Sequence, residues 1–438
     1  MGDGHRTRVV VLLACVLGLE TADSAVIGAV AHGLKQSLDM SNAQLGLLAA
    51  AGPLVGGIAT LPAGMLVDRF ARTRVLSVSI VLWSLAMVAA GAAPSFAMLL
   101  ASRLGLGLVA ATAFPAVASL MGDLFEQRER ARVYSSVLTG EIVGTAVGFL
   151  VAGELTAVLS WRFGFWLLAP PGIALAVAIA RVLPEPARGA SGSPAVDPPQ
   201  LSLWSAVTRI LRVRTVVVII IASALGDYFF AGVRTFGLLF FEHRYGIGQS
   251  AATTLMVLIG LASVAGVLTG GRLADRLLRG GRRNARIVVA AASYLLAVGL
   301  LLGAFSDTPP LVSIPLFALG AAALAGPNPP LDAARLDVMH YGLWGRAEGV
   351  RTVARTAMTA AAPLAFGALT DAFGNTDTAS GASSAFMLML IPLALAGLTV
   401  LFATRTYPAD VAAAAQSKRE AEQTSGQGRR APVRSAAA

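Results

Sequence analysis

Charged side chains inside long apolar segments are the residues of this sequence best placed to do chemistry. Glu20 and Asp23 stand three positions apart in the apolar run 9–31, and Arg103 stands in the run 96–120. Residues three apart lie on nearly the same face of a helix. A charge at the centre of a bilayer costs at least about 2.5–3.5 kcal/mol, so a charge retained there indicates a function.

Asp23 is the leading candidate for a proton-binding site. Burial favours the neutral acid, whereas an arginine nearby favours the carboxylate. A carrier can use that competition, with the Asp23–Arg103 pair made in one state and the acid protonated in another. The alternative is a static buried pair that holds two helices together. Glu20 is either a second proton site or a polar group used in packing.

Glu141 lies in the sequence GEIVGTAVG, where Gly140, Gly144 and Gly148 recur at every fourth position. Small residues at that spacing let two helices approach closely in a membrane. We therefore expect the glycines to form a helix contact and Glu141 to contribute to a polar cavity wall or a substrate contact.

Asp227 and Arg234 stand seven residues apart in GDYFFAGVRTF, two turns along one helix face. Together with Tyr228 and Phe236 they can contact a substrate that has polar and apolar parts. A polar pair within its own helix, flanked by lipid-facing aromatic rings, is the alternative.

The composition indicates that these charged residues lie in membrane-spanning helices. Of the 438 residues, 56% are hydrophobic and 13% are charged, whereas soluble domains have about 25% charged residues. About 20 apolar residues span a bilayer. Twelve runs have that length: 9–31, 43–67, 75–93, 96–120, 132–157, 162–183, 215–241, 250–273, 286–305, 311–331, 346–370 and 384–405.

The distribution of basic residues predicts the orientation. Alternate loops are rich in arginine, whereas the other loops hold only Lys35, Arg162 and Arg244. The positive-inside rule then places both termini in the cytoplasm. We expect the protein itself in the inner membrane of a cell. The net charge of +10 therefore reflects topology, and we expect no nucleic-acid partner. His32 and His340 are expected in loops, in contact with solvent.

The chain divides into two halves. Residues 184–214 are rich in proline and small residues and predict a cytoplasmic linker between six-helix bundles at 1–183 and 215–405; residues 406–438 predict a disordered cytoplasmic tail. The sequence GMLVDRFARTR at 64–74 is similar to GGRLADRLLRGGRR at 270–283. Similar sequences at matching places in two halves are typical of a parallel internal repeat.

These phrases, with Arg103 and Gly107, DLFEQRERAR at 123–132 and SWRFGF at 160–165, make the chain resemble the major facilitator superfamily. The segment 103–136 resembles the spinster-like branch, and drug/proton antiporters are the close alternative. The resemblance implies an all-α membrane protein, with twelve transmembrane helices in two six-helix bundles around a central cavity.

The resemblance also implies a cytoplasmic gate of charged contacts that form in one conformation and break in another. Asp68 would face the amino end of the run 346–370, where Arg351 and Arg355 meet loop acids, and Asp275, Arg279 and Asp332 would match Asp68, Arg72 and Asp123. For Arg69 the alternative to a role in the gate is that it only contributes to the positive-inside distribution of basic residues. The gate residues are Gly64, Asp68, Arg69, Arg72, Asp123, Arg130, Gly271, Asp275, Arg276, Arg279, Asp332 and Arg351. The sequence AGPNPPLD at 325–332 predicts a kink or an end of its helix.

Several function classes are excluded or disfavoured. The sequence has no phosphate-binding loop, and Lys35 and Lys418 stand outside glycine-rich settings, so an ATP-driven pump within this chain is excluded. Motifs for metal or haem are also absent, so we expect no cofactor, no metal and no enzyme activity. Cys15 has no second cysteine to pair with.

We therefore expect a secondary active transporter that acts as a monomer in the lipid bilayer, with protons and a small molecule as ligands. Proton-coupled export of an amphipathic, lysolipid-like or drug-like compound by alternating access is the first reading. Proton-coupled uptake of a polar or anionic solute, favoured if Arg103 and Arg234 both face an empty cavity, is the second. A non-transporting receptor or scaffold on the same fold is the third.

Overall fold

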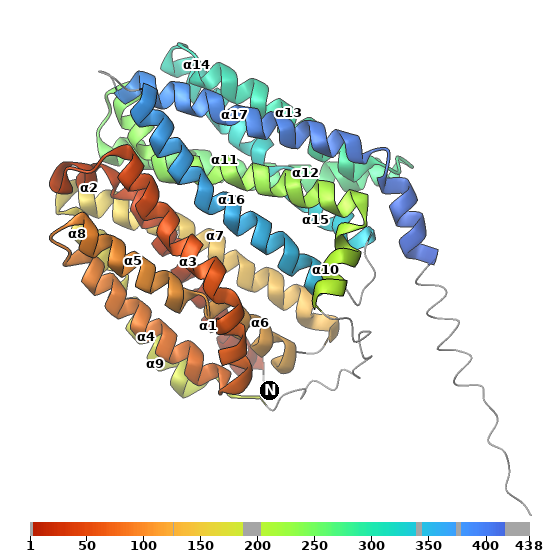
Figure 1. Ribbon diagram of the computed structural model, residues 1–438, viewed down its shortest axis with the longest axis horizontal. Coiled ribbons are helices and arrows are strands. Elements are labelled where there is room, and N and C mark those ends of the chain that lie inside the picture. The colour runs from red at the N-terminus through yellow and green to blue at the C-terminus, as the bar shows by residue number, and fades with distance from the viewer. Residues whose placement is uncertain (1–2, 126, 187–202, 339–343, 374–377, 417–438) are drawn as a thin grey trace, which may run out of the picture.

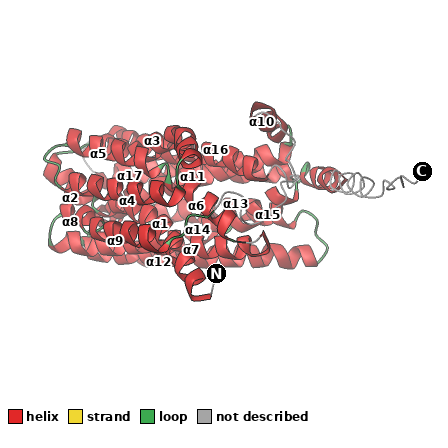
Figure 2. Cartoon of the chain, turned by 90° about the horizontal axis from the view of Figure 1, so that it is seen from below, coloured by secondary structure: helices red, strands yellow, loops and turns green. Residues whose placement is uncertain are grey.

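The computed structural model describes residues 3–125, 127–186, 203–338, 344–373 and 378–416. Over these residues it consists of α-helices and connecting loops, without a β-strand (Figure 2). The helices are α1 (Asp3–Ala29), α2 (Ala31–Leu38), α3 (Asn42–Arg69), α4 (Arg72–Gly91), α5 (Phe96–Ala110), α6 (Ala113–Leu124), α7 (Gln127–Val158), α8 (Trp161–Trp166), α9 (Ala169–Val182), α10 (Leu203–Leu211), α11 (Arg214–Tyr245), α12 (Gln249–Arg279), α13 (Ala285–Phe305), α14 (Pro310–Ala325), α15 (Asn328–Asp337), α16 (Trp344–Phe373) and α17 (Thr378–Ala403).

Ten stretches of the described chain are long and apolar enough to cross a membrane. They coincide with ten of the twelve apolar runs of the sequence. The remaining two runs, 132–157 and 346–370, fall within the long helices α7 and α16, which are not among the ten. The all-helical membrane class is confirmed, and the number of twelve spans stays a prediction.

Several of the expected spans are interrupted. The run 96–120 forms α5 and α6 with a break at Ala111 and Thr112, and the run 311–331 forms α14 and α15 with a break at Gly326 and Pro327. The second break confirms the predicted interruption at the prolines, since a proline inside a helix removes a backbone donor. The first break has no proline at the interruption itself.

The helices gather in two groups, seen in Figure 1 as red to yellow and green to blue. The first group is α1–α9 and the second is α11–α17; the closest contacts between them join α3 to α16, α7 to α12 and α1 to α11. We call the end of the bundle where α1, α4 and α13 begin the terminal end, and the opposite end, where α3, α8 and α12 begin, the distal end. Serine side chains start several helices at the distal end: Ser41 caps α3, Ser95 caps α5 and Ser160 caps α8.

Glycines bring α1 and α7 into backbone contact. A Cβ on Gly140 would lie 2.2 Å from the Ala14 carbonyl oxygen, and one on Gly144 would lie 2.0 Å from that of Gly18. The predicted glycine contact is therefore confirmed, and it fixes Glu141 of α7 beside the part of α1 that carries Glu20. Thr21 supports this arrangement by donating a hydrogen bond to the Glu141 carbonyl oxygen at 2.9 Å.

Two segments differ from their sequence predictions. The linker contains α10, which packs against α11 and α16, so it is not wholly irregular; residues 187–202 lie outside the described residues. The predicted disorder of the tail is wrong for residues 407–416, which are helical. Tyr407 is buried there and anchors that helix, as described below. Residues 417–438 lie outside the described residues.

Candidate functional site

The most deeply buried charges of the first group form an ion pair between α1 and α5. Arg103 Nη1 and Nη2 donate to Asp23 Oδ1 at 2.7 and 2.9 Å. Arg103 is 2% exposed and Asp23 is 5% exposed. Phe165 of α8 lies beneath the guanidinium, with its ring centre 5.4 Å from the Arg103 Cζ. The structure brings together the two residues that the sequence nominated, whereas a proton-coupling role for Asp23 stays a prediction.

This pair is costly to break in place. Removing one partner of a buried ion pair leaves an uncompensated charge and costs about 3–5 kcal/mol. Asp23 can therefore change its protonation only if Arg103 is neutralised otherwise, or if the surroundings of the pair change. Such an arrangement suits a step that is coupled to a conformational change.

Glu20 of α1 and Glu141 of α7 are two further acids on the apolar helices of the first group. Glu20 lines a small pocket between α1, α4 and α5, beside Trp83 and Ala110. It interacts electrostatically with Glu141 and with Asp23. Among the described residues, neither the Glu20 nor the Glu141 carboxylate has a hydrogen bond or an ion pair. Two acids placed near one another in this way favour a bound proton or a bound cation.

The second group places a different pair opposite these acids. Asp227 Oδ2 accepts from Arg355 Nε of α16 at 2.8 Å, and the Arg355 side chain is 53% exposed. Arg355 also interacts electrostatically with Glu141 across the interface between the groups. The expectation that Arg355 meets loop acids at the gate is wrong, because α16 carries it alongside α11.

Arg234 stands between the two sets of charges. It interacts electrostatically with Arg355, Asp227 and Asp23, yet its guanidinium has no hydrogen bond within the described part of the chain. The predicted partner along the same helix, Asp227, is taken by Arg355. Arg234 is therefore the interior arginine that is open to an additional anionic group.

The aromatic residues of α11 lie mostly in the core. Phe236 is 2% exposed and packs on Phe366 of α16, with ring centres 4.5 Å apart. In this conformation no face of the ring is accessible, so its contact with substrate stays a prediction. Tyr228 is partly buried against the same core. Sequence periodicity alone could not separate these two residues, which lie on different faces of one apolar helix.

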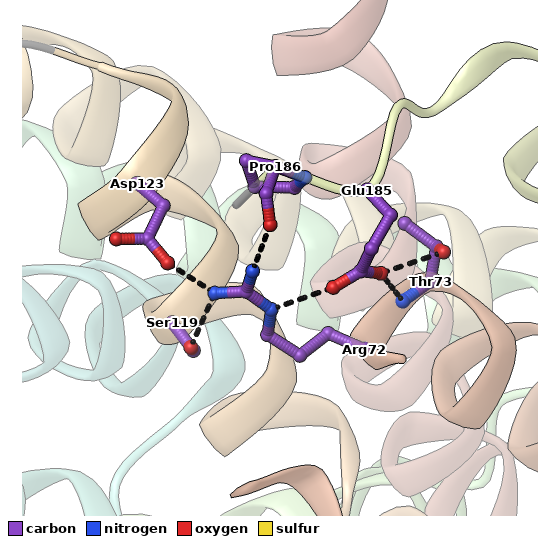
Figure 3. A network of polar contacts seen from close by, with 6 residues as sticks. All are labelled: Arg72, Thr73, Ser119, Asp123, Glu185 and Pro186. Carbon is purple, nitrogen blue, oxygen red and sulfur yellow. Dashed lines mark hydrogen bonds and ion pairs between the residues drawn. The ribbon is translucent and has the colours of Figure 1, made fainter. Parts of the chain in front are cut away.

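Arg72 organises the terminal end of the first group (Figure 3). Its guanidinium pairs with Asp123 of α6, donates from Nε to Glu185 Oε1 at 2.9 Å, and donates from Nη2 to the Pro186 carbonyl oxygen at 2.6 Å. Glu185 Oε2 also accepts from the Thr73 amide and hydroxyl, each at 2.8 Å. The predicted Arg72–Asp123 contact is present. Glu185 was missed, although an acid directly after an apolar run is a visible signal.

The second group repeats this arrangement with other residues than predicted. Arg286 at the start of α13 pairs with Asp337 at the end of α15, and Tyr407 donates a hydrogen bond to the same carboxylate. Arg279 instead donates to the Asp275 carbonyl oxygen of its own helix, and Asp332 pairs with Arg351 at 2.9 Å. Arg279 and Asp332 are therefore not the counterparts of Arg72 and Asp123. Arg279 ends its helix, whereas Arg72 begins one.

The remaining gate residues are placed as follows. Arg69, Asp275, Arg276 and Arg279 are exposed at the terminal end. A Cβ on Gly64 would meet open space, and one on Gly271 would touch Pro329 at 3.4 Å. The side chains of Asp68 and Arg130 lie outside the described part of the structure, so their predicted contacts do too.

The distal end is where polar contacts join the two groups. Asp371 at the end of α16 accepts from the Asn42 side chain at 2.7 Å and from the Ala43 amide at 2.8 Å, at the beginning of α3. Ser250 of α12 donates to Glu154 of α7 at 2.7 Å. His32 of α2 lies 3.2 Å from Glu242 of α11. The expectation of a solvated loop histidine is wrong for His32, and His340 lies outside the described residues.

Comparison with known proteins agrees with these features. A solved structure of a bacterial homolog to the human lysosomal transporter Spinster, in an inward-facing and unoccupied conformation, superposes with a TM-score of 0.81 at 19% identity, covering 94% of this chain and 99% of that one. A D-xylose–proton symporter superposes with a TM-score of 0.72 at 15% identity, covering 90% of this chain and 97% of that one. At these identities the likeness shows the fold.

One curated relative is closer in sequence. The puromycin resistance protein pur8 of Streptomyces alboniger is 35% identical over 184 residues, which are 41% of this chain and 36% of that protein. The chain therefore matches about a third of that relative's length.

Two groups of apolar helices, each with a charged pair among its helices, are the architecture of a membrane transporter. The profile of the Major Facilitator Superfamily matches residues 13–341, and the chain belongs to that family. Its relatives are transporters and not enzymes.

Proposed function

We propose that this chain is a proton-coupled secondary active transporter that exports an amphipathic organic compound, lysolipid-like or drug-like. It works as a monomer with twelve membrane-spanning helices in two six-helix bundles, and the terminal end faces the cytoplasm. The arginines at the terminal end, including Arg72, Arg276 and Arg286, support that orientation by the positive-inside rule.

The observation that carries the proposal is the buried Asp23–Arg103 pair. Both hydrogen bonds converge on one carboxylate oxygen of Asp23 in this conformation. When the groups of helices rearrange, protonation of Asp23 would release Arg103 to another partner. The available drive is about 2.3 kcal/mol per charge per 100 mV of membrane potential.

One relative supports a drug-like substrate. The small pocket beside Glu20 is apolar apart from Glu20 and Ser79, but it has space for water-sized groups only. The curated relative's name, a puromycin resistance protein, supports export of a drug-like compound.

Uptake of an anionic solute is the second candidate, and one observation favours it. The Arg234 guanidinium has no hydrogen bond within the described chain and lies between the charges of both groups. Arg103 does not add to this case, because Asp23 occupies it.

The contacts between the groups support a state that is open toward the terminal end. The contacts of Asn42 with Asp371, Gln249 with Thr156, Ser250 with Glu154 and His32 with Glu242 join the two groups at the distal end. Asp275, a predicted gate acid, is exposed. A latch at the terminal end is expected to be released in such a state, and the superposed Spinster homolog is itself inward-facing.

Transport into or out of liposomes with an imposed pH gradient tests the proposal, with puromycin, a lysolipid and a small organic anion as substrates. We expect gradient-dependent movement of puromycin or the lysolipid, and its loss in Asp23→Asn. Asp307→Asn is the matched control, since Asp307 also pairs with an arginine, Arg244 at 2.8 Å, but on the surface. Gradient-dependent movement of the anion alone supports the second candidate, and movement of none of them under any gradient contradicts both.

A further inference from the structure

The contact between α2 and α11 at the distal end contains a buried carboxylate beside a histidine. The Glu242 side chain is 8% exposed, and the His32 Nδ1 lies 3.2 Å from its Oε2. Among the described residues, both Glu242 oxygens are buried without a hydrogen bond of good geometry. A buried polar group in that condition is costly unless it gains a proton or a partner.

The backbones force this carboxylate into the interface. A Cβ on Gly28 would lie 2.2 Å from the Arg234 carbonyl oxygen, so α1, which leads directly into α2, touches α11 two turns before Glu242. Phe240 and Phe241, which directly precede Glu242, are buried in the aromatic core. Glu242 therefore has no room to turn toward solvent while the two groups stay in contact here.

The surrounding charges are few. From α2, His32 and Lys35 face this region, and Lys35 donates to the Asn42 side chain at 2.7 Å, which in turn binds Asp371 of α16. From α11 itself, His243 lies 6.5 Å from His32 between ring centres, and Arg244 is turned to Asp307. From α12, Gln249 binds the Ala29 carbonyl oxygen and Thr156. Burial first, and then His243 and Lys35, lower the pKa of His32 below its ordinary value.

We propose that His32 and Glu242 form a proton-binding site at the distal end, which binds a proton when the two groups of helices close there. With one added proton the pair is neutral overall, either as a protonated acid beside the imidazole or as an imidazolium beside the carboxylate. Without it a single negative charge is buried at the interface. Opening the distal end hydrates Glu242 and removes that penalty.

Proton binding at this site fixes the direction in which pH shifts the equilibrium between the closed and the open distal end. Because the closed distal end binds one proton more than the open end, acid on that side favours closure and alkali favours opening. A proton taken up from the distal side would thus drive the transporter toward the state that faces the terminal end. The inference rests on the proposed alternating-access function and adds a second protonation site to it, separate from Asp23.

The test measures conformation and needs no transported substrate. In a Cys15→Ala background, spin labels at Leu159→Cys and Leu311→Cys report on the two groups, because both residues are highly exposed. Leu159 lies in the distal loop before α8, and Leu311 lies at the distal start of α14. The distance distribution is recorded in lipid nanodiscs between pH 5.5 and 8.5. One linked proton changes the open-to-closed ratio by at most about tenfold per pH unit.

We expect the open population to rise with pH by between about threefold and tenfold per unit in the parent protein. Glu242→Gln and His32→Asn should each remove most of this response, and the second variant guards against a folding defect in the first. Glu154→Gln is the matched control, since Glu154 also bridges the groups at the distal end but is exposed, and it should keep the response. Glu242→Gln should diminish the response in an Asp23→Asn background as it does in the parent, which separates this site from the coupling pair.

An open population that does not depend on pH in the parent protein overturns the inference. An undiminished response in both Glu242→Gln and His32→Asn overturns it as well. Neither result bears on whether Asp23 couples transport to protons, because that question is decided in the liposome assay.

Discussion

Arg286 pairs with Asp337, 51 residues later in the chain. Arg72 pairs with Asp123 across the same interval of 51 residues. Each arginine stands at the start of a helix, α4 or α13, and each acid stands near the end of an interrupted pair of helices. A third side chain completes each cluster, Glu185 in the first group and Tyr407 in the second. The duplication therefore extends to the charged contacts at the terminal end.

Replacing the arginine at the centre of either cluster should destabilise the protein. In Arg72→Lys, a planar guanidinium that donates to four acceptor atoms is replaced by an ammonium group with three donors. The free energy of unfolding should fall by an amount on the order of 1.5–3 kcal/mol, the value of one hydrogen bond to a charged group. Arg286→Lys should behave alike. Thermal unfolding in detergent measures the effect, with the exposed Arg74→Lys and Arg283→Lys as controls. Equal melting temperatures for Arg72→Lys and Arg74→Lys would contradict the assignment.

Glu185 should make the terminal end sensitive to acid. Burial opposes ionisation, but hydrogen bonds from Thr73 and Arg72 outweigh it and hold the pKa of Glu185 below its ordinary value. A depressed pKa contributes stability that is fully present above the unfolded value, about 4.3 for glutamate, and is lost as the pH falls through the folded value. Between pH 5 and 3, the melting temperature of Glu185→Gln should therefore fall by less than that of the parent protein. Parallel curves would count against the cluster.

The contact between α1 and α7 predicts an asymmetry between two glycines. Gly144→Ala places a Cβ 2.0 Å from the Gly18 carbonyl oxygen, so the helices must separate, whereas a Cβ on Gly105 meets open space. Alanine stabilises a helix by roughly 1 kcal/mol over glycine. We therefore expect Gly105→Ala to melt at or above the parent temperature and Gly144→Ala well below it. A lower melting temperature for Gly144→Ala than for Gly105→Ala supports the close contact of α1 with α7, and the reverse order contradicts it.

A double substitution can distinguish a static Asp23–Arg103 pair from a coupling pair. Asp23→Leu alone should cost about 3–5 kcal/mol, and adding Arg103→Met should restore most of that stability. If the pair couples transport to protons, the stable double variant still lacks gradient-driven transport. If the double variant transports as the parent does, the pair is a structural element only. Thermal unfolding and the liposome assay together supply both readings.

Much of the fold follows from the sequence in a direct physical way. Runs of about 20 apolar residues are long enough to cross a bilayer whatever surrounds them, and ten of them are candidate spans in the structure. The glycines of α7 need a close neighbour because a helix surface without side chains leaves a groove, and α1 fills it. Asp23 and Arg103 were expected to pair because leaving either charge without a partner in an apolar interior is costly.

The partners of half-exposed charges were harder to predict. Arg355 pairs with Asp227 and not with a loop acid, because the position of α16 along α11 decides the contact. The echo of Asp68 in Asp275 suggested Arg279 as the second gate arginine, but Arg286 holds that place at the start of α13. The equal interval to the acids, 51 residues in both groups, was the signal that would have identified it. Phe236 and Tyr228 shared one prediction, and only the packing of Phe366 separates them.

The central claim is that substrate movement exchanges with protons through Asp23. The most direct measurement is the proton movement itself, followed with a pH-sensitive dye sealed inside liposomes when a transported compound is added without any imposed gradient. We predict a substrate-dependent change of internal pH for the parent protein and for Asp307→Asn, and none for Asp23→Asn. A change of equal size in Asp23→Asn, or substrate uptake by the parent without any proton movement, would contradict the claim.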